Sequence, residues 1–500
     1  MNILYRGCES REGFQSKVLN TLYQKGIFSK CTIVSQTADG QDDYSADIYH
    51  EIPAYIGYEC KYNEICDFNT LPAISEDILI GMKQYESTAL DMNSRNYHMH
   101  ICNFNEMEEE YLAHVTFWNY LLDNEHIEFI FLCTVPHHMW EYIIYALAKV
   151  KKIPVLMVSI ANVLNLSEVG TSIENLGSNA ANLFAQKKIC ALGKEMESYY
   201  NCVKYEKNYL PQKERNKRRK ENEKWAFRTY YKKMISVVGY KSRAILKDII
   251  TFNFKKLKID FNIFYSNYEY LMRILSHKRK LKGIKYYNRH LAQKVDLNTK
   301  YIYFALQYVP ESSVLPRGGV FSNQLISIRI LAQAAEQRGI KVYVKEHYLE
   351  YAREKRFYEE LKDMPNVYLL STSEDTYEII DNALAVSSQT GTCMQEAIIR
   401  GIPVITFGNH CLCGAPGVFR VGNIEETEKV LDTIDNSEYH ISSDEVKLYF
   451  GVLEKTLVKS FCEWSCGHVF PINDYIDETV ELIERFVCSG MKEDFYYYKE

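Results

Sequence analysis

The residues best suited to chemistry lie in one polar turn, Ser387–Thr392, between two apolar segments of the sequence. The apolar segments 383–386 and 403–407 predict buried strands, and a short helix is predicted to begin near Thr392. At such a turn backbone N–H groups lack helical acceptors, and hydroxyl groups and the helix dipole add to their attraction for anions. In open α/β sheets, phosphorylated ligands bind at this edge. The turn therefore predicts an anion site, although the same residues also suit a helix cap.

Further polar residues are predicted at the same edge of the sheet. Glu346 and His347 follow the predicted strand 341–345. A histidine beside hydroxyl and N–H groups offsets charge on a phosphate leaving group. The candidate donor-binding residues are His347, Glu346, Ser387, Ser388, Thr390, Gly391, Thr392, Glu396, Glu311, Arg317, Gly414 and Gly417. Each also has a structural interpretation, as a loop carboxylate, a solvated loop cation, a helix-end charge or a turn.

A general base for an acceptor hydroxyl group is expected in the amino-terminal half, across a cleft. The candidates are Asp91, Glu86 and His138, and His137 and Glu9 are further choices. The sequence does not rank them. No metal ion is expected, because His410, Cys411 and Cys413 lack a fourth ligand at zinc-like spacing. The sequence also has no Asp-x-Asp pair at a predicted strand end, which argues against a metal-bridged diphosphate.

Two stretches of alternating strands and helices must position these residues. The first has predicted strands at 2–5, 30–34, 128–133 and 153–158, whereas residues 36–70 are predicted to be rich in loops. The alternation resumes at Lys300, with strands at 301–305, 341–345 and 367–370. This pattern predicts an α/β protein with two Rossmann-like domains that face a cleft, and a basic helical insert between them. The expected divisions are an amino-terminal Rossmann-like domain (1–170), the insert and linker (171–299), a carboxyl-terminal Rossmann-like domain (300–450) and carboxyl-terminal helices that pack back on the first domain (451–500).

Charge is distributed unevenly along the 500 residues. Residues 201–300 carry 27 Lys and Arg against 8 Asp and Glu, a net charge of +19, while the rest of the chain carries −25. A solvated helical insert, an anionic membrane surface and a polyanionic polymer all fit this excess. Nucleic acid is not expected, because no recognisable binding module accompanies the charge.

Composition places the chain among cytoplasmic globular proteins. No apolar run reaches the roughly 18 residues needed to span a bilayer, and the amino terminus has no secretory signal pattern. The 14 cysteines are scattered and are expected to be reduced. The basic stretch adds the expectation of peripheral attachment at the inner face of the plasma membrane.

The second half resembles the capsule polysaccharide biosynthesis family, a group similar to glycosyltransferase-B enzymes. The resemblance covers about 300–425 well and the first domain only loosely, through Val135–His138 and Lys151–Pro154. The matching segments, in order, are Tyr303–Glu311, Leu315–Gly319, Phe321–Gln324, Val344–His347, Ser387–Thr392, Arg400–Val404, Phe407–Gly408 and Gly414–Arg420. The resemblance implies a glycosyltransferase of surface polysaccharide synthesis, with a nucleotide-activated sugar on the carboxyl-terminal domain and a glycan or lipid-linked acceptor on the other.

The resemblance narrows the donor without fixing it. His347 and the Ser387/Ser388 turn are similar to paired elements of bacterial sialyl- and Kdo-transferases, which implies CMP, with UDP and GDP still open. No other cofactor is expected. The family's proline after Glu-His is replaced by Tyr348. Two alternatives remain, namely a sugar-nucleotide epimerase of the same fold and a non-catalytic partner in polysaccharide assembly or export.

Overall fold

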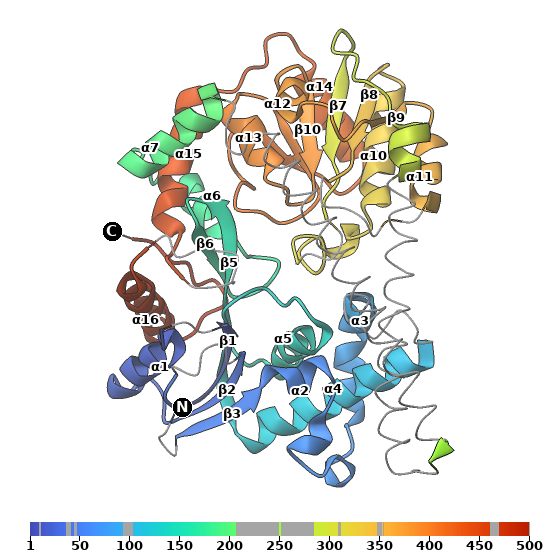
Figure 1. Cartoon of the computed structure of the whole chain (residues 1–500). Coiled ribbons are helices and arrows are strands. Elements are labelled where there is room, and N and C mark those ends of the chain that lie inside the picture. The colour runs from blue at the N-terminus through green and yellow to red at the C-terminus, as the bar shows by residue number, and fades with distance from the viewer. Residues whose placement is uncertain are drawn as a thin grey trace.

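The computed structural model describes residues 1–9, 12–36, 42–44, 48–93, 104–206, 250–251, 285–308, 312–347, 353, 355–460 and 470–499. These residues form two α/β domains, each built on one six-stranded sheet (Figure 1). The predicted fold class of two Rossmann-like domains is therefore confirmed. Glu311, Tyr348 and the basic run 213–220 lie outside the described residues, as does most of the predicted helical insert.

The first sheet has the strand order β3-β2-β1-β4-β5-β6. All neighbouring pairs are parallel except β5 and β6, which are antiparallel. Parallel strands need helical crossovers, which is why helices separate most of them in the sequence. The strands are β1 (Asn2–Glu9), β2 (Lys30–Gln36), β3 (Tyr49–Pro53), β4 (Ile127–Leu132), β5 (Val155–Val163) and β6 (Leu166–Gly170).

Helices cover both faces of this sheet. Alternate residues of β1 and β4 enter different cores: Leu4 and Ile130 face one, while Ile3 and Phe129 face the other. One core is closed by α2 (Ala54–Tyr58), α3 (Glu76–Asn93), α4 (Phe104–Asn124) and α5 (Met139–Lys151). The other is closed by α1 (Phe14–Gln24) and α16 (Ile472–Cys488). Short 3-10 turns occur at Tyr62–Glu64 and Phe68–Thr70.

The second sheet is entirely parallel, in the order β12-β11-β10-β7-β8-β9. Its strands are β7 (Tyr301–Ala305), β8 (Lys341–Lys345), β9 (Val367–Leu370), β10 (Ala385–Ser388), β11 (Val404–Thr406) and β12 (Val418–Arg420). One face packs on α10 (Gln324–Glu336), α11 (Lys355–Lys362) and α14 (Ile424–Ile434). The other packs on α7 (Lys194–Asn201), α12 (Thr376–Asp381), α13 (Cys393–Ile399) and α15 (Ser443–Thr456).

The two domains are joined by packed elements at one side (Figure 1). Ala161 and Val163 at the end of β5 belong to the same buried cluster as α13 and α15 of the second domain. Helix α6 (Ser178–Ala185) packs against α15, and Val458 after α15 pairs with Ser167 of β6. The chain then returns to the first domain, where α16 packs against α1. Two π-helical turns at Cys202–Glu206 and Tyr287–Leu291 and a 3-10 turn at Gly319–Phe321 complete the elements.

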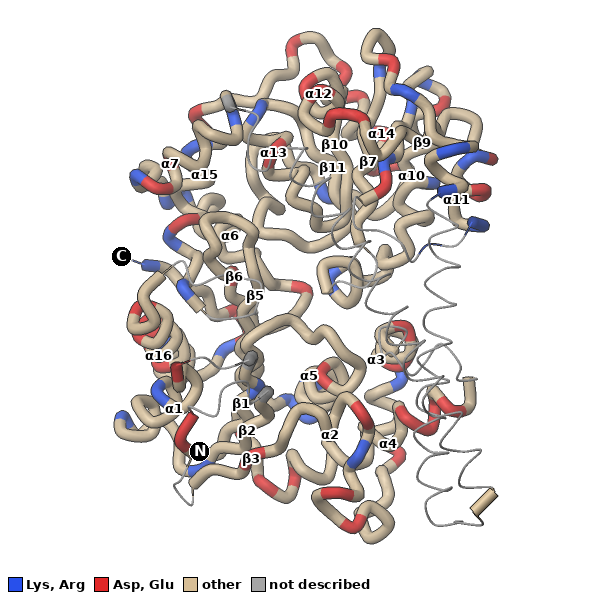
Figure 2. Tube along the Cα trace, viewed as in Figure 1, with Lys and Arg blue, Asp and Glu red and all other residues tan. Residues whose placement is uncertain are grey.

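The prediction that 36–70 is mainly loop was wrong. This segment contains β3, α2 and both short 3-10 turns. In the edge strand β3 only Ile52 is buried, and the other residues are partly or fully exposed. Its hydrophobic alternation is therefore too weak to predict a strand from the sequence. In the described residues, acidic and basic side chains are interspersed over both domains (Figure 2).

Candidate functional site

Both sheets have a point at which the strand order reverses. In the second sheet the chain goes from β7 to β8 on one side and later returns to β10 on the other. In the first sheet, β2 and β4 flank β1 in the same way. Ligands of open α/β sheets bind at the carboxyl ends of the strands beside such a reversal. The residues after β7 and β10, and after β1 and β4, are therefore the first places to seek a site.

At the reversal of the second sheet, Gln307 and Thr390 hold the two strand ends together. The Gln307 side-chain amide donates to Thr390 Oγ1 at 2.9 Å, and Thr390 N donates to Gln307 Oε1 at 3.0 Å. Gln324 of α10 fixes Gln307 in turn, through Gln307 N to Gln324 Oε1 at 2.9 Å. Both Gln307 and Thr390 are buried. Thr390 was a candidate from the sequence, whereas Gln307 was missed because a glutamine after a strand carries no specific signal.

The serine hydroxyl groups of the turn are used inside the protein. Ser387 Oγ donates to Ile405 O at 2.8 Å, and Ser388 Oγ donates to Ala305 O at 3.1 Å. Thr390 Oγ1 donates to Ser313 O at 2.7 Å. Ser387 and Ser388 are fully buried. These hydroxyl hydrogens therefore join neighbouring strands and loops, and a ligand would meet the backbone of this turn first.

The backbone at Gly391 and Thr392 is the accessible part of the turn. Gly391 is half-buried and Thr392 is exposed. Among the described residues, neither N–H group has a backbone acceptor, so both can serve a ligand. A side chain at Gly391 would place its Cβ 2.7 Å from Ser388 Oγ, so glycine is needed for close packing here. Helix α13 has only seven residues, so its dipole is a minor part of this argument.

His347 lies just after strand β8, which pairs with β7 on the side away from β10, and the backbone of His347 is held by Glu346. His347 N donates to Glu346 Oε1 at 2.8 Å, while Arg353 Nε and Tyr358 OH donate to Glu346 Oε2 at 2.8 and 2.7 Å. The Glu346 side chain is completely buried, whereas His347 is half-buried and stacks near Tyr308, with ring centroids 5.9 Å apart. Glu346 therefore positions His347, which is the residue of the two that can reach a ligand.

Three other candidates are placed by packing. Glu396 is buried and accepts a hydrogen bond from Tyr377 OH at 3.1 Å. Gly414 has φ +100°, and an added Cβ would lie 2.6 Å from the Ala181 side chain. Gly417 has φ +82°, and an added Cβ would lie 2.5 Å from Ile441. Each has a structural role that explains its residue type without a ligand.

The loop 312–321, between β7 and α10, connects the carboxyl edges of both sheets. Leu315 belongs to the buried apolar cluster of the first domain, together with Val135 and Met139. Arg317 forms an ion pair with Glu168 of β6, with Arg317 Nη2 and Glu168 Oε1 2.5 Å apart. The Arg317 and Glu168 side chains are only 7% and 2% exposed. Arg317 was a candidate donor-binding residue or a solvated loop cation, and in this structure it is buried between the domains.

At the reversal of the first sheet, a histidine pair follows β4. His137 Nδ1 lies 2.8 Å from Val135 O, and donation from Nδ1 places the basic lone pair on Nε2. The Glu141 carboxylate accepts from His137 N at 2.6 Å and from His138 N at 3.1 Å. The His138 side chain accepts from the Glu141 backbone at the start of α5 and packs edge-on against Tyr58. His137 is therefore better placed than His138 to act as a base.

Arg6, at the end of β1, anchors this arrangement. Arg6 Nε donates to Glu141 Oε1 at 2.9 Å, and Arg6 Nη2 forms a second, short contact with the same oxygen. Burial alone would raise the pKa of Glu141, but Arg6 and the two histidines outweigh it and lower the pKa to about 2. Glu141 is thus a buried carboxylate that stays ionised at neutral pH. Strand β1 ends at Glu9, which is another of the candidate bases named from the sequence.

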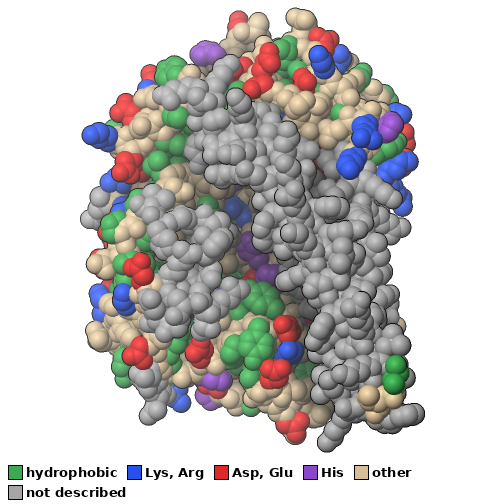
Figure 3. All heavy atoms as spheres, in the orientation of Figure 1, with side chains coloured by type: hydrophobic (Ala, Val, Ile, Leu, Met, Phe, Trp, Pro, Cys, Tyr) green, Lys and Arg blue, Asp and Glu red, His purple; other side chains and the backbone are tan. Residues whose placement is uncertain are grey.

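Asp91 and Glu86 lie on α3, to one side of this histidine pair. Asp91 is exposed near the end of the helix, and partial desolvation raises its pKa above the ordinary value. Glu86 is already paired, with Lys83 Nζ 2.7 Å from its Oε1. The structure groups His137 and His138 with the strand ends and leaves Asp91 and Glu86 on the neighbouring helix. Figure 3 shows histidine and basic side chains in a hollow near the middle of the molecule.

His410 and Glu168 are two buried titratable groups beside Arg317. Burial, with a smaller effect of Arg317, lowers the pKa of His410 to about 3. Burial raises the pKa of Glu168, and Arg317 partly opposes that rise. His410 Nδ1 accepts from Leu412 N at 3.2 Å, which fixes the ring as a neutral acceptor. Within the described ranges, no group of three or more His, Cys, Asp and Glu side chains is arranged to hold a metal ion.

We expect His410 to make folding weaker in acid. Its folded pKa lies below that of the unfolded chain, so its contribution to stability is present above pH 6.5 and is lost as the pH falls toward 3. Below pH 6.5 the loss approaches about 1.4 kcal/mol per pH unit. His410→Asn keeps a side-chain acceptor for Leu412 N and removes the titration. Urea unfolding should show the stability of the variant relative to the wild type rising by about 0.3 kcal/mol from pH 7.5 to 6.5 and by about 1 kcal/mol from pH 6.5 to 5.5. Parallel pH dependences would contradict this assignment.

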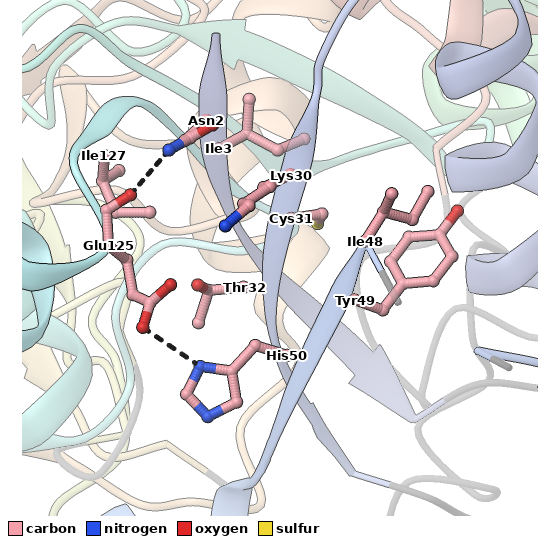
Figure 4. Close-up of a pocket in the computed structure, with 10 residues that line it drawn as sticks. All are labelled: Asn2, Ile3, Lys30, Cys31, Thr32, Ile48, Tyr49, His50, Glu125 and Ile127. Atoms are coloured by element: carbon pink, nitrogen blue, oxygen red, sulfur yellow. Dashed lines mark hydrogen bonds and ion pairs between the residues drawn. The ribbon is translucent and has the colours of Figure 1, made fainter. Parts of the chain in front are cut away.

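A small pocket of about 90 Å³ lies at the opposite, amino-terminal edge of the first sheet (Figure 4). His50 Nδ1 and Glu125 Oε1 lie 3.7 Å apart there, and Asn2 Nδ2 donates to Glu125 O at 2.8 Å. Parallel sheets bind their ligands at the carboxyl ends of the strands, so this pocket is on the wrong side for the candidate site.

Comparisons with known proteins found solved structures of low similarity to this chain. No protein-family model matches the sequence, and no curated protein matches it. A Thermosulfurimonas dismutans KpsC, a beta Kdo 2,7 transferase, is 18% identical over 36% of this chain and 63% of its own, with a TM-score of 0.21. S. aureus TarM, solved with UDP, is 14% identical over 39% of this chain and 37% of its own, with a TM-score of 0.22.

A third similar structure is UDP-GlcNAc 2-epimerase from Methanocaldococcus jannaschii. It is 10% identical over 91% of this chain and 99% of its own, with a TM-score of 0.25. The matches to KpsC and TarM span less than two thirds of the length of those two proteins. At these TM-scores the argument for function rests on the site itself. None of the helices in the described part of the chain has the length and apolar character needed to cross a membrane.

Proposed function

We propose that this protein is a glycosyltransferase of capsule or related surface polysaccharide synthesis. It would transfer a sugar from a nucleotide-activated donor to a glycan or a lipid-linked glycan. One observation carries the proposal: loop 312–321 joins the carboxyl edges of the two sheets, each with polar residues at its strand-order reversal. A two-substrate reaction needs two such binding edges held close together.

The donor half of the proposed site is the turn after β10 together with His347. The N–H groups of Gly391 and Thr392 would bind the phosphate, and His347 would add a donor or positive charge beside it. These groups meet the charge that develops on the leaving nucleotide as the glycosidic bond breaks. The Gln307–Thr390 hydrogen bonds hold the turn in place before the substrate arrives.

The acceptor half is the first domain around His137. In the proposed reaction the acceptor oxygen forms a bond to the anomeric carbon, and the bond from that carbon to the nucleotide phosphate breaks. The phosphate oxygen keeps the electron pair, and His137 Nε2 takes the acceptor's proton. Glu141 positions the base by holding both histidine backbones and stabilises positive charge on the ring.

The donor half predicts a selective stabilisation by one nucleotide. At a nucleotide concentration of 100 times Kd, the wild type should gain about 2.7 kcal/mol of stability. His347→Ala removes a hydrogen bond to a charged group, worth about 1.5–3 kcal/mol, and should weaken binding roughly 10- to 100-fold. Thermal shift with CMP, UDP, GDP and their sugar conjugates tests both statements.

His440→Ala is the matched control for that experiment, because His440 is exposed and lies on the loop before α15. It should retain the shift of the wild type. An absent shift with all nucleotides would argue for a non-catalytic assembly partner. An equal loss in both histidine variants would remove His347 from the site.

The basic stretch 201–300 is proposed to hold the protein at an anionic membrane surface. Each Lys or Arg near such a surface contributes about 1 kcal/mol. Changing the six basic residues between Lys213 and Lys220 to Gln should therefore abolish sedimentation with liposomes that contain anionic lipid. Neutral liposomes are the control, and binding that is unchanged in the variant would remove this part of the proposal.

A further inference from the structure

Loop 312–321 is fastened to the turn after β10 at two points. Ser313 O accepts from Thr390 Oγ1 at 2.7 Å, and Phe321 O accepts from the Gln389 side-chain amide. Gly318 lets the loop turn tightly, since an added Cβ would contact Val314 O. The position of the loop and the position of the proposed nucleotide turn are thus set together.

The other side of the same loop is fixed to the first domain by Arg317. Besides its ion pair with Glu168, Arg317 Nη1 donates to Ser159 Oγ at 3.4 Å, and Nη2 donates to Asn409 O at 3.4 Å. Ser159 lies on β5 and Glu168 on the paired strand β6, in register with each other. Arg317 therefore links the carboxyl side of the first sheet, the loop after β7 and the loop after β11.

The chemistry of this link differs from that of the apolar packing beside it. Two charges removed from water are costly to bury, and apolar residues of similar size would often be as stable. The Arg317 guanidinium, which also contacts Ser159 Oγ and Asn409 O, nevertheless specifies distance and angle, which apolar packing does not. Leu315 already supplies apolar contact from the same loop. The pair thus adds geometric precision where contact alone is already provided.

We propose that Arg317 and Glu168 are positioning residues that set the register between the nucleotide turn and the acceptor side of the site. The path runs from Glu168 to Arg317, along the loop to Ser313, and then to Thr390. Neither residue touches the reacting atoms. This inference rests on the proposed function for its catalytic consequence, but the mechanical link between Glu168 and the turn can be measured without any substrate.

The test uses the full chain with Glu168→Gln, Arg317→Met and the double variant Arg317→Met/Glu168→Met. Arg338→Met is the matched control, because Arg338 pairs with Asp432 at 2.7 Å on the outer surface of the second domain. Amide hydrogen exchange of the peptide around 388–393 reports on the turn in the absence of ligand. Nucleotide Kd, kcat and KM for transfer are measured on the same proteins.

We expect faster amide exchange at 388–393 in Glu168→Gln and Arg317→Met than in the wild type. Arg338→Met should exchange at the wild-type rate. Displacement of about 1 Å between reacting groups can cost about 10²-fold in rate, so kcat should fall by that order while nucleotide Kd changes little. The double variant should regain the wild-type unfolding midpoint but not the wild-type kcat. Apolar packing restores stability, but it does not specify distance and angle.

The outcomes separate this inference from the proposed function. Unchanged exchange at 388–393 in both single variants overturns the link, whatever the enzyme does. Recovery of kcat together with stability in the double variant reduces the pair to a structural contact and also overturns the proposal. If the wild type transfers no sugar but the exchange rises as expected, the link stands and the proposed function fails.

Discussion

His137→Ala is expected to lower kcat for sugar transfer by about 10²- to 10⁴-fold, the range for loss of a general base. His137 follows β4 at the strand-order reversal, and its Nδ1 faces Val135 O, which leaves Nε2 as the basic nitrogen. The proposed nucleotide site lies on the other domain, so the nucleotide Kd should stay within about twofold. Steady-state transfer kinetics with the donor found in the thermal-shift screen supply the measurement.

Two further variants test whether the activity lost in His137→Ala reflects loss of the basic nitrogen. His137→Asn keeps an N–H group near Val135 O but has no basic nitrogen, so it should be as inactive as the alanine variant. His50→Ala changes an exposed histidine at the opposite edge of the same sheet and should be as active as the wild type. If asparagine restores activity, His137 acts by holding the backbone and the base is elsewhere.

Glu141→Gln is expected to reduce the free energy of unfolding by about 3–5 kcal/mol, the cost of leaving one charge of a buried pair without its partner. The Arg6 and Glu141 side chains are only 6% and 2% exposed, so Arg6 would stay buried and charged. Glutamine keeps an acceptor for the N–H groups of His137 and His138, which separates the lost charge from lost hydrogen bonds. Urea unfolding at pH 7 gives the value.

The pH dependence of this effect has a definite sign. The pKa of Glu141 is about 2 in the folded protein and about 4.5 without its partners, so its contribution to stability is present above pH 4.5 and is lost toward pH 2. The difference between wild type and Glu141→Gln should therefore shrink below pH 4.5. The double variant Arg6→Met/Glu141→Leu should recover much of the lost stability. A difference that persists undiminished at pH 2.5 would contradict the assignment to charge.

The regular parts of the fold could be predicted because buried strands and amphipathic helices leave strong periodic signals. The strand–turn–helix of β10 and α13 was predicted from its apolar flanks and polar turn. Strand β3 was missed because only Ile52 is buried in it. Helix α16 packs on the first domain through hydrophobic residues such as Tyr475, Ile483 and Phe486.

The candidate site was predictable at the level of strand ends and less so at the level of side chains. His347 follows β8 and the His137/His138 pair comes a few residues after β4, so their sequence positions already placed them near the carboxyl ends of strands. The hydrogen bonds of the Ser387 and Ser388 hydroxyl groups could not be predicted from the sequence, because their acceptors, Ile405 O and Ala305 O, are brought close by tertiary contacts. Glu168 was missed for the same reason, since its partner Arg317 is 149 residues away in the chain.

The most direct test of the central claim is release of free nucleotide from the selected nucleotide sugar, measured with and without an acceptor glycan from surface polysaccharide. A glycosyltransferase of the proposed kind predicts release that depends on the acceptor, lengthens the glycan by one sugar and is lost in both His137→Asn and His347→Ala. Conversion of the donor without acceptor would instead show an epimerase. Binding of nucleotide or glycan with no turnover of donor under either condition would contradict the transferase account.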